Sequence, residues 1–239
     1  MNRKIAISGF VLLSLCLAGC AGKQTGASTP RPLTPEQQKA KDQLGSMMAQ
    51  VAQTAQNYKA MDTPTLLGKL SEQSAMKKEP FNSPAYRELK GRTDVDPAAL
   101  VALVEKTPTA DSMLPLLLVR KQNAKAYQGI PAETRAAVLT DALNKSATFN
   151  IWGIPDVYLE DASQAMLETG KSTVPALKRM LRDTRPAPIY GSQEVTVAAR
   201  YQYRLCDYAL FFLQKIQGNA DLRMPMAPAD RDALIKKMM

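Results

Sequence analysis

Proline recurs directly after a helix-capping side chain along the first hundred residues of this 239-residue chain. Proline suits the first turn of a helix, because its missing N–H would have no partner there anyway. A preceding Ser, Thr or Asp can accept a hydrogen bond from a free backbone N–H. The dipeptides are Thr34-Pro35, Thr63-Pro64, Ser83-Pro84 and Asp96-Pro97, and Thr34 with Gln37 has capping-box spacing. These repeated start signals restrict most of the chain to a succession of helices.

The pattern of apolar residues extends this prediction to the whole chain after residue 34. It predicts helices over 35–59, 64–78, 84–90, 97–106, 111–126, 132–145, 156–169, 172–183, 198–217 and 229–238. Only the short run Glu194–Val197 alternates as a strand would. We therefore expect an all-α fold.

Composition limits both the residue types of the core and the kinds of catalytic or metal site that the chain can form. Hydrophobic residues make up 45% of the chain and aromatic residues only 6%, so the core should be largely aliphatic. Histidine is absent, which excludes Ser-His and Cys-His catalysis and histidine-bound metals. The sequence contains neither a phosphate-binding glycine loop nor a metal-ligand cluster. We expect no catalytic residue, cofactor or metal. The spacing of Ser74 and Lys77 leaves a histidine-independent hydrolase as a remote alternative.

The first twenty residues, MNRKIAISGFVLLSLCLAGC, have the pattern of an export signal. Arg3 and Lys4 precede an apolar stretch, 5–18, that is too short to span a bilayer. Its end, Leu17-Ala18-Gly19-Cys20, resembles the lipobox of bacterial lipoproteins. That resemblance implies cleavage between Gly19 and Cys20, a diacylglycerol on the Cys20 thiol and an acylated new amino group.

A lipid anchor on Cys20 would place the chain on a membrane in the cell envelope. Ala21 follows where an Asp favours retention in the inner membrane of some bacteria, so the family rule implies the outer membrane, facing the periplasm, in a cell with two membranes. The formal net charge of +9 is spread along the chain. Such a balance suits anionic lipid or envelope polymer and is a weak signal for nucleic acid, which we do not expect as a partner.

The sequence predicts four successive parts. Residues 1–19 are the signal peptide, and 20–33 form the lipidated cysteine with a small, polar, proline-containing tether. Residues 34–95 form a helical N-terminal extension, and 96–239 form the main helical domain. In the extension, Leu44, Met47, Met48 and Val51 make a narrow apolar stripe. This helix either packs on the main body, which we favour, or serves as an arm that seeks a partner.

The segment 156–185, DVYLEDASQAMLETGKSTVPALKRMLRDTR, resembles a HEAT-type helical hairpin. Gly170 fits the turn between the two helices and Ser172 the next N-cap. The first helix would carry Ala162, Ala165, Met166 and Leu167, and the second Val174, Pro175, Leu177, Leu181 and Asp183. Residues 203–218 resemble the start of a further repeat. The resemblance implies a HEAT-like α-solenoid that presents an interaction surface. An irregular bundle of helical hairpins stays open, because 146–155 and 184–197 interrupt the repeats.

A basic cluster lies on the second helix of this segment and at its exit. The cluster holds Lys178, Arg179, Arg182 and Arg185, of which the first, third and fourth are spaced to share one helix face. We expect this face either to be solvated or to bind an anionic partner, with Tyr190 of the following loop contributing. Because the opposite face carries apolar residues, folding should turn the charges outward.

Three further positions have competing interpretations. Trp152, the only tryptophan, is either a hydrophobic plug between helices or a recognition residue. Cys206 lies in an apolar helix and, without a nearby base, should be a buried structural thiol. Arg204 and Asp207 are close enough in a helix to form an ion pair, which we expect to be structural.

These observations predict a non-enzymatic envelope lipoprotein that acts as a helical-repeat scaffold for another protein. The alternative is a binder of an anionic envelope component, either a lipid head group or a glycan polymer. The expected binding surface comprises Lys178, Arg182, Arg185, Tyr190 and Trp152, and the expected membrane contact is the lipid on Cys20.

Overall fold

A computed structural model describes residues 33–72, 83–191, 194–219, 221 and 223–239. The described chain is mostly helical, with a single two-stranded sheet among these residues, which confirms the all-α class. The described chain divides into two units at the boundary between Asn57 and Tyr58. The helices that follow residue 60 therefore lie in one unit, including those on either side of the expected border at residue 95.

The first helices run α1 (Pro35–Ala60), α2 (Thr63–Glu72), α3 (Pro84–Gly91), α4 (Pro97–Lys106), a 3₁₀ turn η2 (Ala110–Ser112), α5 (Met113–Gln122), α6 (Ala124–Gly129) and α7 (Ala132–Lys145). The strands β1 (Gly153–Ile154) and β2 (Tyr158–Leu159) follow. The chain continues through α8 (Asp161–Thr169), a 3₁₀ turn η3 (Gly170–Thr173), α9 (Val174–Met180), α10 (Glu194–Tyr201), α11 (Leu205–Ile216) and α12 (Pro228–Met238).

Most of the predicted helix starts are present with their capping bonds. The Ser83 hydroxyl accepts from the Tyr86 N–H at 3.1 Å, and the Asp96 carboxylate accepts from the Ala98 N–H at 2.9 Å. Thr34 and Gln37 form both bonds of the capping box. At α2 the prediction was wrong by one position. Asp62 accepts from the Thr65 N–H at 2.8 Å, while the Thr63 hydroxyl donates to Asp94 instead.

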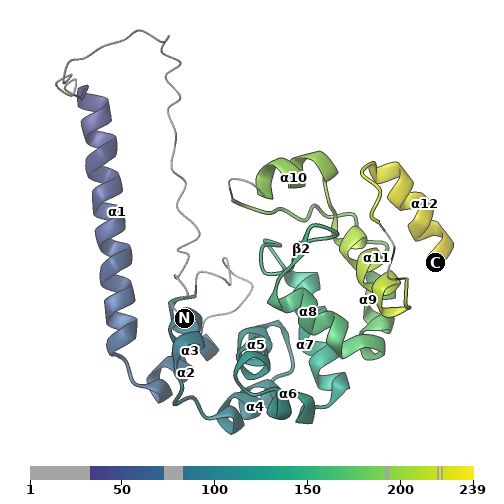
Figure 1. Ribbon diagram of the computed structural model, residues 1–239, viewed down its shortest axis with the longest axis horizontal. Coiled ribbons are helices and arrows are strands. Elements are labelled where there is room, and N and C mark those ends of the chain that lie inside the picture. The colour runs from purple at the N-terminus through teal and green to yellow at the C-terminus, as the bar shows by residue number, and fades with distance from the viewer. Residues whose placement is uncertain (1–32, 73–82, 192–193, 220, 222) are drawn as a thin grey trace, which may run out of the picture. The chain divides into compact units, whose positions relative to one another are not determined.

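The core of residues 58–239 is centred on α5, which buries every residue from Met113 to Val119. Helices α3, α4, α6, α7 and α8 pack around α5, and α11 packs against α8, α9 and α12 (Figure 1). Aromatic side chains concentrate on and around α11, where the Phe149 and Tyr208 ring centroids lie 4.7 Å apart. The core is thus aliphatic at α5 and aromatic at α11.

The segment with HEAT-like features folds differently in detail from the expected hairpin. Its first helix begins at Asp161 rather than 156, because Asp156 has a positive φ of 63° and turns the chain from β1 into β2. Gly170 has the predicted positive φ of 66°, but the residues after it form η3, so Ser172 does not cap a helix. Helix α8 packs chiefly on α7, and α9 chiefly on α11.

Three other expected elements are corrected by the structure. The predicted helix 198–217 is two helices, since Gln202 takes a left-handed φ of 51° between α10 and α11. The strand-like run 194–197 begins α10 instead. The predicted helix 111–126 is divided into η2, α5 and α6, with Asn123 capping α6 by accepting from the Ala126 N–H.

Candidate functional site

Helix α9 is short, and its burial decides which of its side chains face solvent. Leu177, Met180 and Leu181 are buried, the first of them completely, and the helix packs along α11. The predicted apolar side of this helix is therefore confirmed. Lys178 and Arg179 of α9, with Arg182 just beyond its end, are left exposed.

A groove of about 380 Å³ lies between the basic side chains of α9 and the end of α12. It is lined by Lys178, Arg179, Leu181, Arg182, Met238 and Met239. We call this the basic groove. Its cations come from α9 and its exit, while its apolar part comes from Leu181 and the two methionines. The groove thus combines positive charge with an apolar surface.

The three cations of the basic groove have no ion pair or hydrogen bond with any residue that the structure describes. Two further exposed cations, Lys236 and Lys237, occupy the last turn of α12. An anion entering the groove would therefore meet three cations that form no ion pair with a described residue, and exposed charges of this kind attract anions over about a Debye length.

Arg185 does not belong to this groove, which corrects the predicted face of Lys178, Arg182 and Arg185. Helix α9 ends at Met180, so helical spacing no longer applies at Arg185. Its guanidinium instead binds the Asp183 carboxylate, at 2.7 Å from Nη2 to Oδ2, and the backbone oxygen of Asn144. Arg185 also holds the pKa of Asp183 below its usual value by hydrogen bonding.

Arg179 lines the basic groove, although the predicted binding face did not include it. It also lines a second groove of about 310 Å³ between α7 and α9. This second groove carries Asp141 and Asp183, which pair with Lys145 and Arg185 respectively. Two carboxylates thus share this second groove with Arg179, which leaves the basic groove as the better anion site.

Tyr190 is exposed at 54% but lies outside the lining of the basic groove. Asn150 holds its backbone from both sides: the Asn150 side-chain oxygen accepts from the Tyr190 N–H at 3.0 Å, and the Asn150 amide donates to the Tyr190 carbonyl. The structure thus does not bring Tyr190 together with Lys178 and Arg182 in one cavity.

Trp152 is fully buried and cannot serve as a surface recognition residue in this structure. Its indole N–H donates to the Ser146 hydroxyl at 2.8 Å, and its ring lies edge-on to Phe212 with centroids 6.1 Å apart. Full burial fits the interpretation of Trp152 as a hydrophobic plug and does not fit its interpretation as a recognition residue.

Cys206 is fully buried, as its place in an apolar helix predicted. Burial, helped by the nearby Asp207 carboxylate, raises the pKa of the thiol to about 12. A nucleophilic cysteine needs a lowered pKa and access to solvent. The geometry therefore suits a structural thiol.

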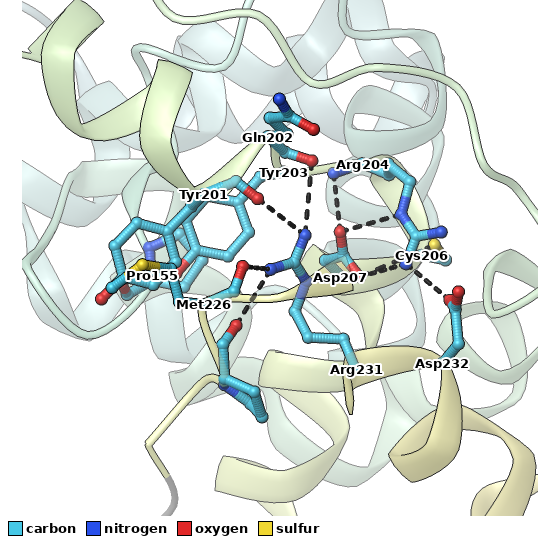
Figure 2. Close-up of polar contacts among 11 residues, drawn as sticks. Pro155, Tyr201, Gln202, Tyr203, Arg204, Cys206, Asp207, Met226, Arg231 and Asp232 are labelled. Carbon is cyan, nitrogen blue, oxygen red and sulfur yellow. Dashed lines mark hydrogen bonds and ion pairs between the residues drawn. The ribbon is translucent and has the colours of Figure 1, made fainter. Parts of the chain in front are cut away.

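A buried charge cluster joins the start of α11 to α12 (Figure 2). Arg204 and Asp207 form the predicted ion pair, at 3.0 Å between Nη2 and Oδ1, and the Arg204 N–H also donates to Asp207. Asp232 of α12 binds Arg204 at 2.6 Å. The fourth member, Arg231, is fully buried and places Nε 3.0 Å from Oδ1 of Asp207. Neither Asp232 nor Arg231 was predicted from the sequence, because both lie far from Arg204 and Asp207 in the chain.

Arg231 also binds the corner between α10 and α11. Its Nη1 donates to the carbonyls of Pro225 and Met226, and its Nη2 to those of Tyr201 and Gln202 (Figure 2). The guanidinium carbon lies 5.1 Å from the centre of the Tyr203 ring. Two arginines face two aspartates, so the cluster is electrically balanced, which suits the structural role expected for the Arg204–Asp207 pair.

Other expected features receive no support as sites. The described residues contain neither a group of acidic or cysteine side chains that could hold a metal nor a helix long and apolar enough to cross a membrane. Ser74 and Lys77 lie outside the described residues, as do Gly19 and Cys20.

Comparisons with protein families, with curated proteins and with solved structures found no match for this chain.

Proposed function

We propose that this chain is a lipoprotein of the bacterial envelope that acts as a non-enzymatic interaction scaffold. In this proposal a lipid on Cys20 anchors it, and the helical unit 58–239 presents a docking site, in the manner of HEAT-like proteins, to an acidic segment of an envelope protein. The basic groove is that site. The observation that carries the proposal is the set of three exposed cations, Lys178, Arg179 and Arg182, without a described acidic partner.

The chemistry of the groove supports a peptide that is both acidic and apolar. Carboxylates would pair with the three cations at the rim, and an apolar side chain would pack against Leu181, Met238 and Met239. Methionine surfaces adapt to different partners because the side chain is unbranched and flexible. Charge at a rim steers association and sets its salt dependence more than it sets affinity.

The test is charge reversal with cross-linking in intact envelopes. Lys178→Glu, Arg179→Glu and Arg182→Glu together should reduce capture of the envelope partner about tenfold or more at low salt, because three attractive contacts become repulsive. The matched control reverses Arg87, Lys121 and Lys125, which are exposed elsewhere and change the net charge equally. If both triple variants lose partner capture equally, or if neither loses it, the basic groove is not the docking site.

The lipid anchor has its own test. Cells labelled with an alkyne fatty acid should transfer label to the wild-type chain and not to Cys20→Ser, and the variant should leave the membrane fraction. Labelling and membrane fractionation of Cys20→Ser at the wild-type level would remove the anchor from the proposal.

A second candidate function is binding of an anionic envelope lipid or glycan polymer. The proximity of Met238 and Met239 to the three cations favours it, since a lipid combines an anionic head group with an apolar chain. Vesicles with and without anionic lipid distinguish the two candidates. Binding that requires anionic lipid and that the triple reversal abolishes would favour the lipid.

A further inference from the structure

Helix α1 is the longest helix described, and none of its 26 residues is buried. Its apolar stripe is accordingly exposed: Leu44 at 53%, Met47 at 63%, Met48 at 50% and Val51 at 54%. Isolated helices in water are marginal, and most helical stability comes from packing an apolar face. Among the described residues, this long helix therefore has an exposed apolar face of the kind that normally packs against another surface.

The stripe follows a seven-residue repeat. When Leu44 and Val51 are placed at position a, Ala40 and Met47 fall at position d, and Met48 falls beside the seam at e. Thr54 occupies the next d position, where its hydroxyl is already bonded to the Gln50 carbonyl at 2.8 Å. The seam from residue 40 to residue 54 is therefore free of charged side chains.

The polar side chains of α1 fall on the outer positions of the same repeat. Gln38 donates to Asp42 at 2.8 Å, and these residues occupy positions b and f. Gly45 lies at another outer position, where a side-chain carbon would meet no atom within 4 Å. The polar contacts of these residues therefore lie on the outer face of α1, away from the apolar seam.

The charges that flank the seam of one α1 helix are complementary to those of a second α1 helix. Glu36 falls at position g and Lys41 at position e of the following heptad. In a parallel pair of helices, a g residue of one helix lies next to the e residue five positions later on the other, and such pairs set partner choice and orientation. Two copies of α1 in parallel register would form two Glu36–Lys41 ion pairs, one on each side of the seam.

We propose that α1 pairs in parallel with α1 of a second copy of this chain. Leu44, Met47 and Val51 form the dimer seam, with Met48 packing along its edge. The short seam gives a weak dimer, which a high local concentration on a membrane would favour. Under the proposed function, a dimer of this kind would carry two basic grooves.

Cysteine cross-linking tests the seam. In the full-length chain with Cys16 and Cys20 replaced by serine, Val51→Cys should form disulfide-linked dimers under mild oxidation. Ala49→Cys, two residues away at the outer position f, is the matched control and should cross-link at least tenfold less. Because this background lacks Cys20, the result does not depend on the lipid anchor. Equal cross-linking at both positions would overturn the proposal.

Orientation is tested by mixing two variants of different size. A tagged Leu44→Cys chain and an untagged Val51→Cys chain should each form disulfides with their own kind. A product of intermediate size that joins residue 44 to residue 51 would indicate antiparallel pairing and overturn the parallel register.

Charge reversal tests the flanking pairs by sedimentation at low salt. Glu36→Lys and Lys41→Glu should each weaken self-association about three- to tenfold, because two attractions become repulsions. A mixture of the two variants should associate as well as wild type or better, since every Lys then faces a Glu. If the mixture associates no better than either variant alone, the register is wrong.

Discussion

The guanidinium Nε of Arg231 lies 3.0 Å from Oδ1 of Asp207, and neither side chain is exposed to solvent. The attraction is an ion pair, because this N–H forms no hydrogen bond among the described residues while the other guanidinium nitrogens bind four backbone carbonyls. A buried charge that loses its partner is costly because it has also lost its water. The last helix is thereby joined to the corner between α10 and α11.

The first prediction concerns this joint. Arg231→Met should lower the free energy of unfolding by about 3–5 kcal/mol, since it leaves four carbonyls without their donor and Asp207 with one cation fewer. Asp232→Asn is the control, because Asp232 belongs to the same cluster but is 56% exposed, and it should cost less than about 1 kcal/mol. Urea unfolding measures both. Similar stabilities of the two variants would show that packing alone holds α12.

Two glycines with positive φ provide the second prediction. A side-chain carbon at Gly153 would lie 2.5 Å from the Tyr158 carbonyl oxygen, whereas at Gly170 it would meet nothing within 4 Å. Both substitutions to alanine strain the backbone, at about 1–2 kcal/mol. Gly153→Ala must also displace β2, so it should be the more destabilising by at least about 1 kcal/mol. Thermal unfolding of the two variants gives the comparison, and an equal loss would contradict the packing of the hairpin.

Alkaline pH should weaken the fold partly through Cys206. Its pKa is raised from 9.0 in a free thiol to about 12 by burial and by Asp207. As pH rises, the thiol of the unfolded chain therefore loses its proton before the buried thiol does. The contribution of Cys206 to the free energy of unfolding is fully present below about pH 9 and is lost as pH rises towards 12. Cys206→Ala should cost about 1–2 kcal/mol at neutral pH through lost packing. Between pH 8 and pH 10.5 its unfolding free energy should fall less steeply than that of wild type, and parallel curves would contradict a buried thiol.

The fourth prediction separates the two aromatic residues that the sequence pattern assigns to a binding surface. Trp152→Ala should cost about 3–5 kcal/mol, because the ring is fully buried and bonded to Ser146. Tyr190→Ala should change stability by less than about 0.5 kcal/mol, since the side chain is exposed and the Asn150 bonds involve only its backbone. Tryptophan emission of the wild type should resist quenching by iodide. Ready quenching would place Trp152 at the surface.

Local signals in the sequence predicted the all-α class and several of its details. The caps at Ser83 and Asp96 and the Arg204–Asp207 pair depend on residues within three positions of each other. Such interactions require only the helix itself to form. The burial of Leu177 and Cys206 followed from apolar periodicity, which also acts within one element.

What the sequence could not predict depends on contacts between distant segments. The helix expected over 198–217 breaks at Gln202, where Arg231 binds the carbonyls that the break leaves open, 29 residues away in the chain. Arg185 does not lie on the basic face, because α9 ends at Met180 and the Arg185 guanidinium also binds the oxygens of Asn144 in α7. Arg179 lines the basic groove because the end of α12 lies beside α9, which the sequence pattern does not indicate. In each case the contact joins segments far apart in the chain, so the local pattern of residues does not predict it.

The dependence of that break on Arg231 has a consequence for the order in which the chain acquires its structure during synthesis. The carbonyls of Tyr201 and Gln202 leave the ribosome about thirty residues before the guanidinium that binds them. Until then α11 can form, but Asp207 has only Arg204 as its cation. The C-terminal part of the helical unit therefore completes its folding only after its last helix has been made.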